Sequence, residues 1–151
     1  MPVRAGTPHF RTTFPRQTAG RASRLARTDG TPLRVLIVED EYFTRLQLKQ
    51  MLEELCAKVI ATTSHGAMAI VLSELYRPDI VLMDIRIDGS MDGIEAARWI
   101  LDRLAIPVVF VSGYDDATMR ACIAGLSGPE LVVKPIVSEQ LEAAIRRACD
   151  L

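Results

Sequence analysis

Short apolar runs alternate with longer amphipathic stretches along most of the chain. The runs are rich in Val and Ile, as strands covered on both faces are, and a helical spacing of apolar side chains follows each run. This alternation predicts an α/β fold, a doubly wound parallel sheet with helices on both faces in three α/β/α layers. The predicted strands are residues 33–38, 59–62, 80–83, 108–111 and 131–133. The predicted helices are 43–55, 66–76, 93–104, one from about 117 and one that follows Ser138.

Three local signals fix the ends of these helices. The pair Arg77-Pro78 stops the helix over 66–76, because the residue before a proline avoids the helical conformation. Asp92 is expected to cap the helix that starts at residue 93, and Ser138 to cap the last helix.

Polar side chains stand where the predicted strands end. Glu39 and Asp40 follow the first strand, Asp84 the third, Ser112 the fourth and Lys134 the fifth. Parallel sheets of this kind bind ligands beyond the carboxyl ends of their strands. Crowded carboxylates repel one another, and a hard cation such as Mg²⁺ offsets that repulsion while also accepting phosphate oxygens. The pattern therefore predicts a magnesium-dependent phosphoryl-transfer site in which Asp84 is the nucleophile and Lys134 neutralises phosphoryl charge.

Charge divides the chain into two parts. Residues 1–32 carry a net charge of +5, which leaves −6 for residues 33–151 because the whole chain carries −1. The first part lacks an apolar period, so we expect a basic, disordered tail over 1–32 and one domain over 33–151. Three interpretations of the tail stay open: a solvated extension or start-site artefact, a basic arm for nucleic acid or an acidic partner, and an Arg-rich transit peptide. Its charged residues are Arg4, Arg11, Arg16, Arg21, Arg24, Arg27 and Asp29.

The expected location is the cytoplasm. No apolar run is long enough for a membrane span, and no secretory signal is evident. The cysteines Cys56, Cys122 and Cys149 are odd in number and widely spaced, which fits neither a disulfide framework nor a metal site. Reduced thiols are typical of cytoplasmic proteins.

Five segments of the chain resemble the receiver domain of bacterial two-component response regulators. The resemblance covers about residues 33–151 and implies the flavodoxin-like strand order 2-1-3-4-5 with five helices. It also implies phosphoryl transfer from a histidine-kinase phosphohistidine to an aspartate with Mg²⁺. The segments are Val35-Leu36-Ile37-Val38-Glu39-Asp40-Glu41, Ile80-Val81-Leu82-Met83-Asp84, Met91-Asp92-Gly93-Ile94-Glu95-Ala96, Val111-Ser112-Gly113 and Val133-Lys134-Pro135.

The resemblance also implies a role for individual residues. Asp84 is the expected phosphorylation site, and Ser112 and Lys134 are expected to bind the phosphoryl oxygens. The peptide bond before Pro135 is expected to be cis. The implied magnesium ligands are Glu39, Asp40, Asp84 and the backbone carbonyl of Arg86.

The chain departs from the family pattern at the positions that usually couple phosphorylation to output. Leu131 stands where an aromatic switch residue is usual, and Asp88 stands where the loop after the phosphorylated aspartate usually has a proline. The segment from Phe110 to Tyr114 instead resembles the "FAT GUY" receivers of alphaproteobacteria. We hypothesise that Tyr114 replaces the missing aromatic switch.

These features predict a stand-alone response regulator, a phosphoacceptor rather than a turnover enzyme. Its expected partners are a histidine kinase and a phosphotransfer or adaptor protein, and it is expected to be a monomer or a phosphorylation-dependent homodimer. One alternative is a haloacid-dehalogenase-like phosphohydrolase using Asp84, although that chemistry needs an acid where Arg86 stands. The other alternative is a regulator that contacts nucleic acid through its basic tail, which would bind weakly and with strong salt dependence.

Overall fold

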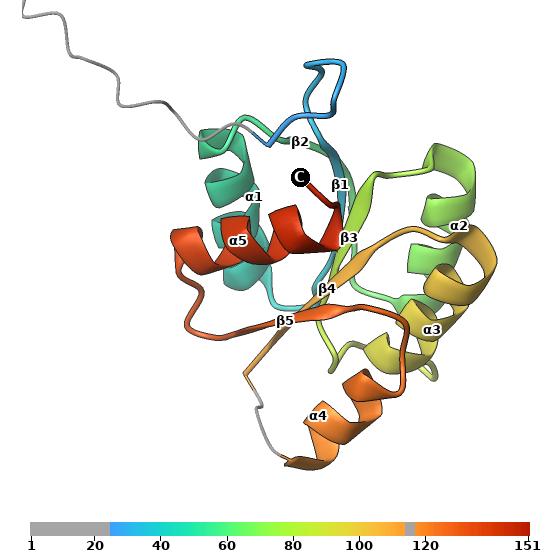
Figure 1. Cartoon of the computed structure of the whole chain (residues 1–151). Coiled ribbons are helices and arrows are strands. Elements are labelled where there is room, and N and C mark those ends of the chain that lie inside the picture. Colours follow the sequence, from blue (N-terminus) through green and yellow to red (C-terminus); the bar gives the residue numbers. More distant parts are fainter. Residues whose placement is uncertain (1–24, 114–116) are drawn as a thin grey trace, which may run out of the picture.

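A five-stranded parallel sheet forms the centre of the molecule (Figure 1). The computed structural model describes residues 25–113 and 117–151. The strand order is β2-β1-β3-β4-β5, which confirms the predicted fold class and order. The strands are β1 (Arg34–Val38), β2 (Lys58–Thr63), β3 (Ile80–Met83), β4 (Val108–Ser112) and β5 (Glu130–Val133).

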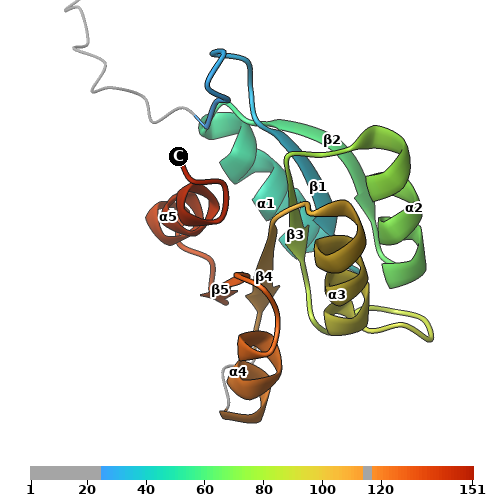
Figure 2. The same ribbon diagram turned by 45° about the vertical axis from the view of Figure 1, so that its right-hand side comes forward.

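Helices cover both faces of the sheet, as the alternating pattern predicted. Helices α1 and α5 lie on one face, and α2, α3 and α4 lie on the other (Figures 1 and 2). Every connection between neighbouring strands therefore crosses a face of the sheet. The helices are α1 (Tyr42–Glu54), α2 (Gly66–Tyr76), α3 (Gly93–Leu104), α4 (Ala117–Ala124) and α5 (Ser138–Ala148).

Two hydrophobic cores result from the alternation of side chains along the strands. In β1, Val35 and Ile37 point into the core beneath α1 and α5, whereas Leu36 and Val38 point into the core beneath α2 and α3. All four side chains are buried. The three central strands β1, β3 and β4 are buried on both faces, which is why they read as nearly continuous apolar runs rather than alternating ones.

The ends of two helices test the predicted caps. Asp92 accepts a hydrogen bond from the amide of Glu95, and the Glu95 carboxylate accepts one from the amide of Asp92, so the predicted cap of α3 is confirmed. The predicted cap of α5 is wrong. Ser138 is the first helical residue, and Val137 is the N-cap, which has no side-chain group to accept a hydrogen bond.

Residues 25–33 fold back on the domain, and we call them the N-terminal strap. The amide of Leu25 donates to the carbonyl of Leu55 at 2.8 Å, and the amide of Leu33 donates to the carbonyl of Leu25 at 2.9 Å. The Leu25 side chain is completely buried in the core beneath α1 and α5. The guanidinium of Arg27 donates two hydrogen bonds to the carboxylate of Asp79, at 2.8 and 2.7 Å.

The strap corrects the predicted boundary at residue 33. The described part of the former tail belongs to the fold, because Leu25 fills core space and Arg27 pairs with an acid just before β3. Leu25 is the one leucine in this Arg-rich stretch, and a single apolar residue makes no periodic pattern from which its burial could be predicted. Residues 1–24 lie outside the described residues, so the prediction of a disordered tail is untested for them.

Replacing Leu25 by alanine should lower the free energy of unfolding by about 3 kcal/mol. The substitution removes a fully buried side chain and leaves a cavity at the end of the core. Urea unfolding followed by circular dichroism measures the change. Leu46→Ala is the matched control, because Leu46 is 50% exposed and the same substitution there should cost less than about 0.5 kcal/mol. Equal losses in the two variants would contradict the packing of the strap.

Candidate functional site

The five polar residues predicted from the strand ends lie at one edge of the sheet. The parallel register places the ends of β1, β3, β4 and β5 side by side. The amide of Asp84 donates to the carbonyl of Val38 at 2.9 Å, and the amide of Lys134 donates to the carbonyl of Ser112 at 2.8 Å. These bonds continue the sheet one residue beyond its strands and hold Asp84 and Lys134 in position.

The ammonium group of Lys134 joins two carboxylates from different strands. Its Nζ atom lies 3.0 Å from Oε2 of Glu39 and 3.1 Å from Oδ2 of Asp84. Glu39 is completely buried and Asp84 is 7% exposed, so both ion pairs are largely shielded from water. Buried acids that lack a partner are costly, and Lys134 supplies the compensating positive charge.

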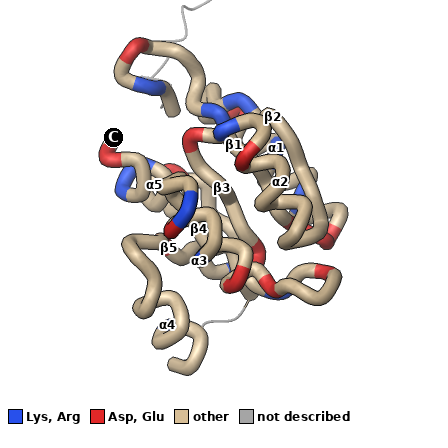
Figure 3. The backbone as a smooth tube through the Cα atoms, turned by 90° about the vertical axis from the view of Figure 1, so that its right-hand side faces the viewer, with Lys and Arg blue, Asp and Glu red and all other residues tan. Residues whose placement is uncertain are grey.

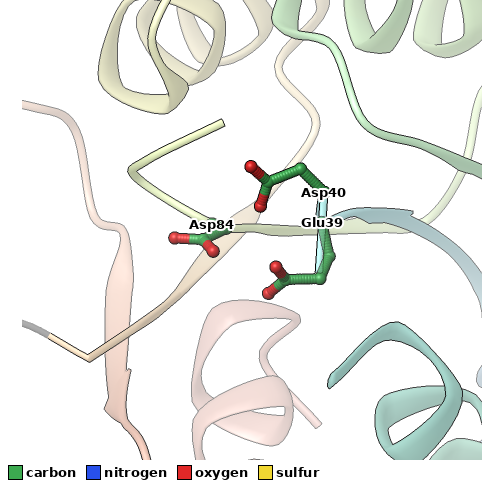
Figure 4. Close-up of side chains that lie close together, drawn as sticks. All are labelled: Glu39, Asp40 and Asp84. Atoms are coloured by element: carbon green, nitrogen blue, oxygen red, sulfur yellow. The ribbon is translucent and has the colours of Figure 1, made fainter. Parts of the chain in front are cut away.

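Glu39, Asp40 and Asp84 form a cluster of carboxylates (Figure 4). One oxygen of each lies within 4.8 Å of the others. Asp40 is half-buried, so the cluster opens to solvent on its side. Carboxylate oxygens are the protein ligands that Mg²⁺ prefers, and the ion usually keeps several waters. The donor set fits a single Mg²⁺ held by these three acids.

Burial and neighbouring charges shift the pKa values of Glu39 and Lys134. Burial raises the pKa of Glu39 to about 7, and its hydrogen bonds from the Glu41 amide and from Lys134 only partly counteract this. Burial alone would lower the pKa of Lys134, but its hydrogen bond to Glu39 and the charge of Asp84 outweigh that effect and raise it. Lys134 is therefore a permanent cation at neutral pH, whereas Glu39 titrates there.

This titration predicts a pH-dependent stability without metal. The pKa of Glu39 is higher in the folded chain than the ordinary value of 4.5, so between these values the folded chain binds more protons than the unfolded one. Stability should therefore fall, by about 2 kcal/mol, as the pH rises from about 5 to 8. Urea unfolding in EDTA measures this loss, and Mg²⁺ added at the higher pH should reverse it. Glu39→Gln should show a smaller loss, and an equal loss would exclude Glu39 as its cause.

The three consecutive acids Glu39, Asp40 and Glu41 have different roles. The Glu41 carboxylate caps α1, accepting hydrogen bonds from the amides of Phe43 and Thr44 and from the Thr44 hydroxyl. Its own amide donates to Oε1 of Glu39 at 3.0 Å. Glu41 thus fixes the start of α1 and the orientation of Glu39. The sequence did not reveal this cap, because glutamate is not among the usual N-cap residues.

A sharp turn after β3 presents Asp84. The amide of Arg86 donates to Oδ1 of Asp84 at 3.1 Å, and the amide of Gly93 donates to the carbonyl of Ile85 at 2.9 Å. Gly93 packs directly on the backbone of Asp84 and Ile85, where a side chain would collide. The start of α3 therefore packs against Asp84, the predicted phosphorylation site. Sequence reasoning assigned no role to Gly93.

The other described residues predicted for the site lie in or beside β3, β4 and β5. Ser112 ends β4 and is completely buried beside the site. Leu131 lies in β5, opposite Phe110 of β4, and packs against the core beneath α2 and α3. Arg86 is exposed, and metal binding by its carbonyl stays a prediction. The Lys134–Pro135 bond is cis, as expected, and Tyr114 lies outside the described residues.

None of the helices within residues 25–113 and 117–151 has the length and apolar character that crossing a bilayer requires.

Similarity to known proteins agrees with the resemblance noted in the sequence. The family model of the response regulator receiver domain matches residues 35–146. The transcriptional regulatory protein PdtaR of Mycobacterium tuberculosis is 36% identical over 119 residues, which is 78% of this chain and 57% of that protein. The positive alginate biosynthesis regulatory protein of Pseudomonas aeruginosa is 34% identical over 119 residues, 77% of this chain and 47% of that protein. The chain thus spans about half the length of these curated relatives.

A solved structure extends the likeness to the fold. A chain of the CheX–CheY–BeF3–Mg²⁺ complex from Borrelia burgdorferi superposes with a TM-score of 0.74 and 27% identity, covering 83% of this chain and 96% of that one. Both relatives are named as regulatory proteins. They give no support to the phosphohydrolase or to the nucleic-acid alternative.

Proposed function

Because the chain belongs to the response regulator receiver domain family, we propose that it accepts a phosphoryl group on Asp84 from the phosphohistidine of a histidine kinase. The observation that carries this proposal is the position of Lys134. Its ammonium group contacts Asp84 and Glu39 at once, at the point where three carboxylates from two strands converge. This places one fixed cation beside a nucleophile and a candidate metal site.

The proposed reaction moves the phosphoryl group from nitrogen to oxygen. A carboxylate oxygen of Asp84 forms the new P–O bond as the P–N bond of the phosphohistidine breaks, and the leaving imidazole takes up a proton. Glu39, Asp40 and Asp84 would hold Mg²⁺, which would supply positive charge to the phosphoryl oxygens. Lys134 pairs with another of these oxygens, and the Ser112 hydroxyl donates a hydrogen bond to the third.

The residues around Asp84 prepare it for this role. The Arg86 amide donates a hydrogen bond to Oδ1 of Asp84, so the orientation of the carboxylate is fixed before the phosphohistidine binds. The Lys134 ammonium lies 3.1 Å from Oδ2 of Asp84, so a positive charge already stands beside the attacking group. The reaction ends as an acyl phosphate, so we propose a phosphoacceptor that hydrolyses its own phosphoryl group slowly rather than an enzyme that turns over a substrate.

We further propose that the phosphorylated chain signals through protein contacts in the cytoplasm, where histidine kinases donate their phosphoryl groups. Its partners would be a histidine kinase and a phosphotransfer or adaptor protein. Leu131 occupies the usual switch position, but it is an aliphatic residue that packs against the core, so we propose that another residue transmits the change. Tyr114 stays our candidate for that role.

The experiment is phosphorylation of the full chain by acetyl phosphate or phosphoramidate with Mg²⁺, followed by intact mass spectrometry. We expect a gain of one phosphoryl group, no gain in EDTA, and loss of the added mass on treatment with hydroxylamine, which cleaves acyl phosphates. No gain with either donor would overturn the proposal. Continuous release of phosphate from a phosphomonoester would favour the phosphohydrolase instead.

A further inference from the structure

Helix α2 has an apolar outer face that nothing in the described structure covers. The helix contains one charged residue, Glu74, and it is drawn mostly in tan in Figure 3. Met68 is 48% exposed, Val71 50% and Leu75 67%. A helix that is apolar all round is usually buried on all sides, and α2 is not.

The neighbouring helix α3 shows that the fold does not require this apolar face. Both helices pack on the same side of the sheet, and both have an outer surface (Figure 2). The exposed residues of α3 are charged, as is usual for a surface helix. They are Glu95, Arg98, Asp102 and Arg103.

Met68, Val71 and Leu75 lie on the side of α2 that faces away from α3. A Cβ atom on Gly66 would lie 3.2 Å from Cβ of Ala96, so the Gly66 side of α2 contacts α3. At about 100° per residue, the three apolar residues lie roughly opposite Gly66. Their spacing of three and then four residues is that of a seam between two packed helices. We call these three residues the α2 stripe.

The two ends of the α2 stripe carry opposite charge. At the start of α2, Asp88 is exposed and forms a backbone bridge with His65. At its end, Arg77 is exposed, and the guanidinium of Arg34 donates to the carbonyls of Tyr76 and Arg77 at 2.7 and 2.9 Å. The end of α2 thus carries two cations, Arg34 and Arg77, against the one exposed acid Glu74 and is net basic. The acidic start lies about 16 Å away along the 11-residue helix.

From these features we infer that the α2 stripe binds the α2 stripe of a second copy of this chain, with the two helices antiparallel. A two-fold axis through Val71 brings Arg77 of one copy to Asp88 of the other, twice over. A parallel pair would place like charges together, which is costly. The chain supplies both the apolar seam and its matching charges, so no other partner is needed to explain them.

The size of the surface indicates a weak, reversible dimer. The three residues of the α2 stripe, which are 48–67% exposed, offer an apolar patch of about 300 Å², at the lower end of functional patches on monomers. Two such patches and their rims fall at the low end of specific interfaces. The contact uses no atom of Glu39, Asp40 or Asp84, so it should form in the unphosphorylated chain.

Sedimentation equilibrium over a wide range of protein concentration tests the inference. We expect a monomer–dimer equilibrium, and we expect Val71→Glu to weaken it at least about tenfold because two buried charges would meet at the axis. Phe43→Glu is the matched control: Phe43 is 75% exposed on α1, and the same charge there should leave the dimer intact. Circular dichroism checks that each variant is folded.

Charge reversal tests the antiparallel geometry. Arg77→Asp and Asp88→Arg should each weaken the dimer, and the double variant should restore it. Asp84→Asn should dimerise like the unmodified chain, which separates this inference from the proposed phosphorylation. A chain that stays monomeric at every concentration would overturn the inference and indicate another protein as the occupant of the stripe. A dimer unaffected by Val71→Glu, or a double variant that is not restored, would overturn it as well.

Discussion

An Asp84→Asn chain is expected to gain no phosphoryl mass under conditions that fully label the unmodified chain. The amide has no anionic oxygen to attack phosphorus. Of the two other acids in the cluster, Asp40 has no ion pair with Lys134 in the described structure. Glu39 is completely buried and already bound by Lys134 and the Glu41 amide. The expected loss is therefore complete rather than partial, and intact mass spectrometry after treatment with acetyl phosphate and Mg²⁺ measures it.

Asp88→Asn provides the control for this variant. Asp88 is an exposed acid four residues further along the same loop, so removing its charge changes the local potential without touching the cluster. The Asp88→Asn chain should be labelled to the same extent as the unmodified chain. Labelling of Asp84→Asn, or loss of labelling in Asp88→Asn alone, would show that the phosphoryl group goes to a different residue.

Gly93→Ala is expected to destabilise the chain by about 3 kcal/mol or more. A Cβ atom on Gly93 would overlap the carbonyl oxygen of Asp84 and lie 2.9 Å from Cα of Ile85. Both contacts are with backbone, which cannot move aside as a flexible side chain can. The turn after β3 must open, and the carboxylate of Asp84 moves with it. Urea unfolding should therefore show a large loss of stability, accompanied by slower phosphorylation of the molecules that remain folded.

Gly125→Ala is the matched glycine. A Cβ atom there would lie 3.6 Å from the carbonyl oxygen of Cys122, which is an ordinary contact. This change should leave the free energy of unfolding within about 0.5 kcal/mol of the original value. Equal stability of the Gly93→Ala and Gly125→Ala chains would mean that α3 does not start against Asp84 as described.

The sheet and the position of its site could be predicted from the sequence because both follow from local patterns. An apolar run such as Ile80 to Met83, followed by Asp84, specifies a buried strand and the polar residue at its end. Parallel pairing then brings such ends together without further information. The cap at Asp92 was equally local, because the capping residue and its partner Glu95 are three positions apart.

Features that depend on distant contacts could not be predicted in this way. Leu25 is buried because it meets residues near the end of α1, and Arg27 is ordered by Asp79, 52 positions away. Nothing within ten residues of Leu25 signals either contact. The role of Gly93 depends likewise on how closely α3 approaches the end of β3, which composition and periodicity do not report.

The two ion pairs of Lys134 allow the folded fraction of a protein sample to be measured. Lys134 is 95 positions from Glu39 and 50 from Asp84, and it follows β5, which is the last strand of this sheet in sequence order. The three groups meet only after β5 has joined a sheet whose other edge was made much earlier. Chemical reactivity at Asp84 should therefore appear late and all at once during refolding. The fraction of molecules that become phosphorylated would then equal the fraction with a complete sheet. The helical signal in circular dichroism does not distinguish these molecules from partly folded ones.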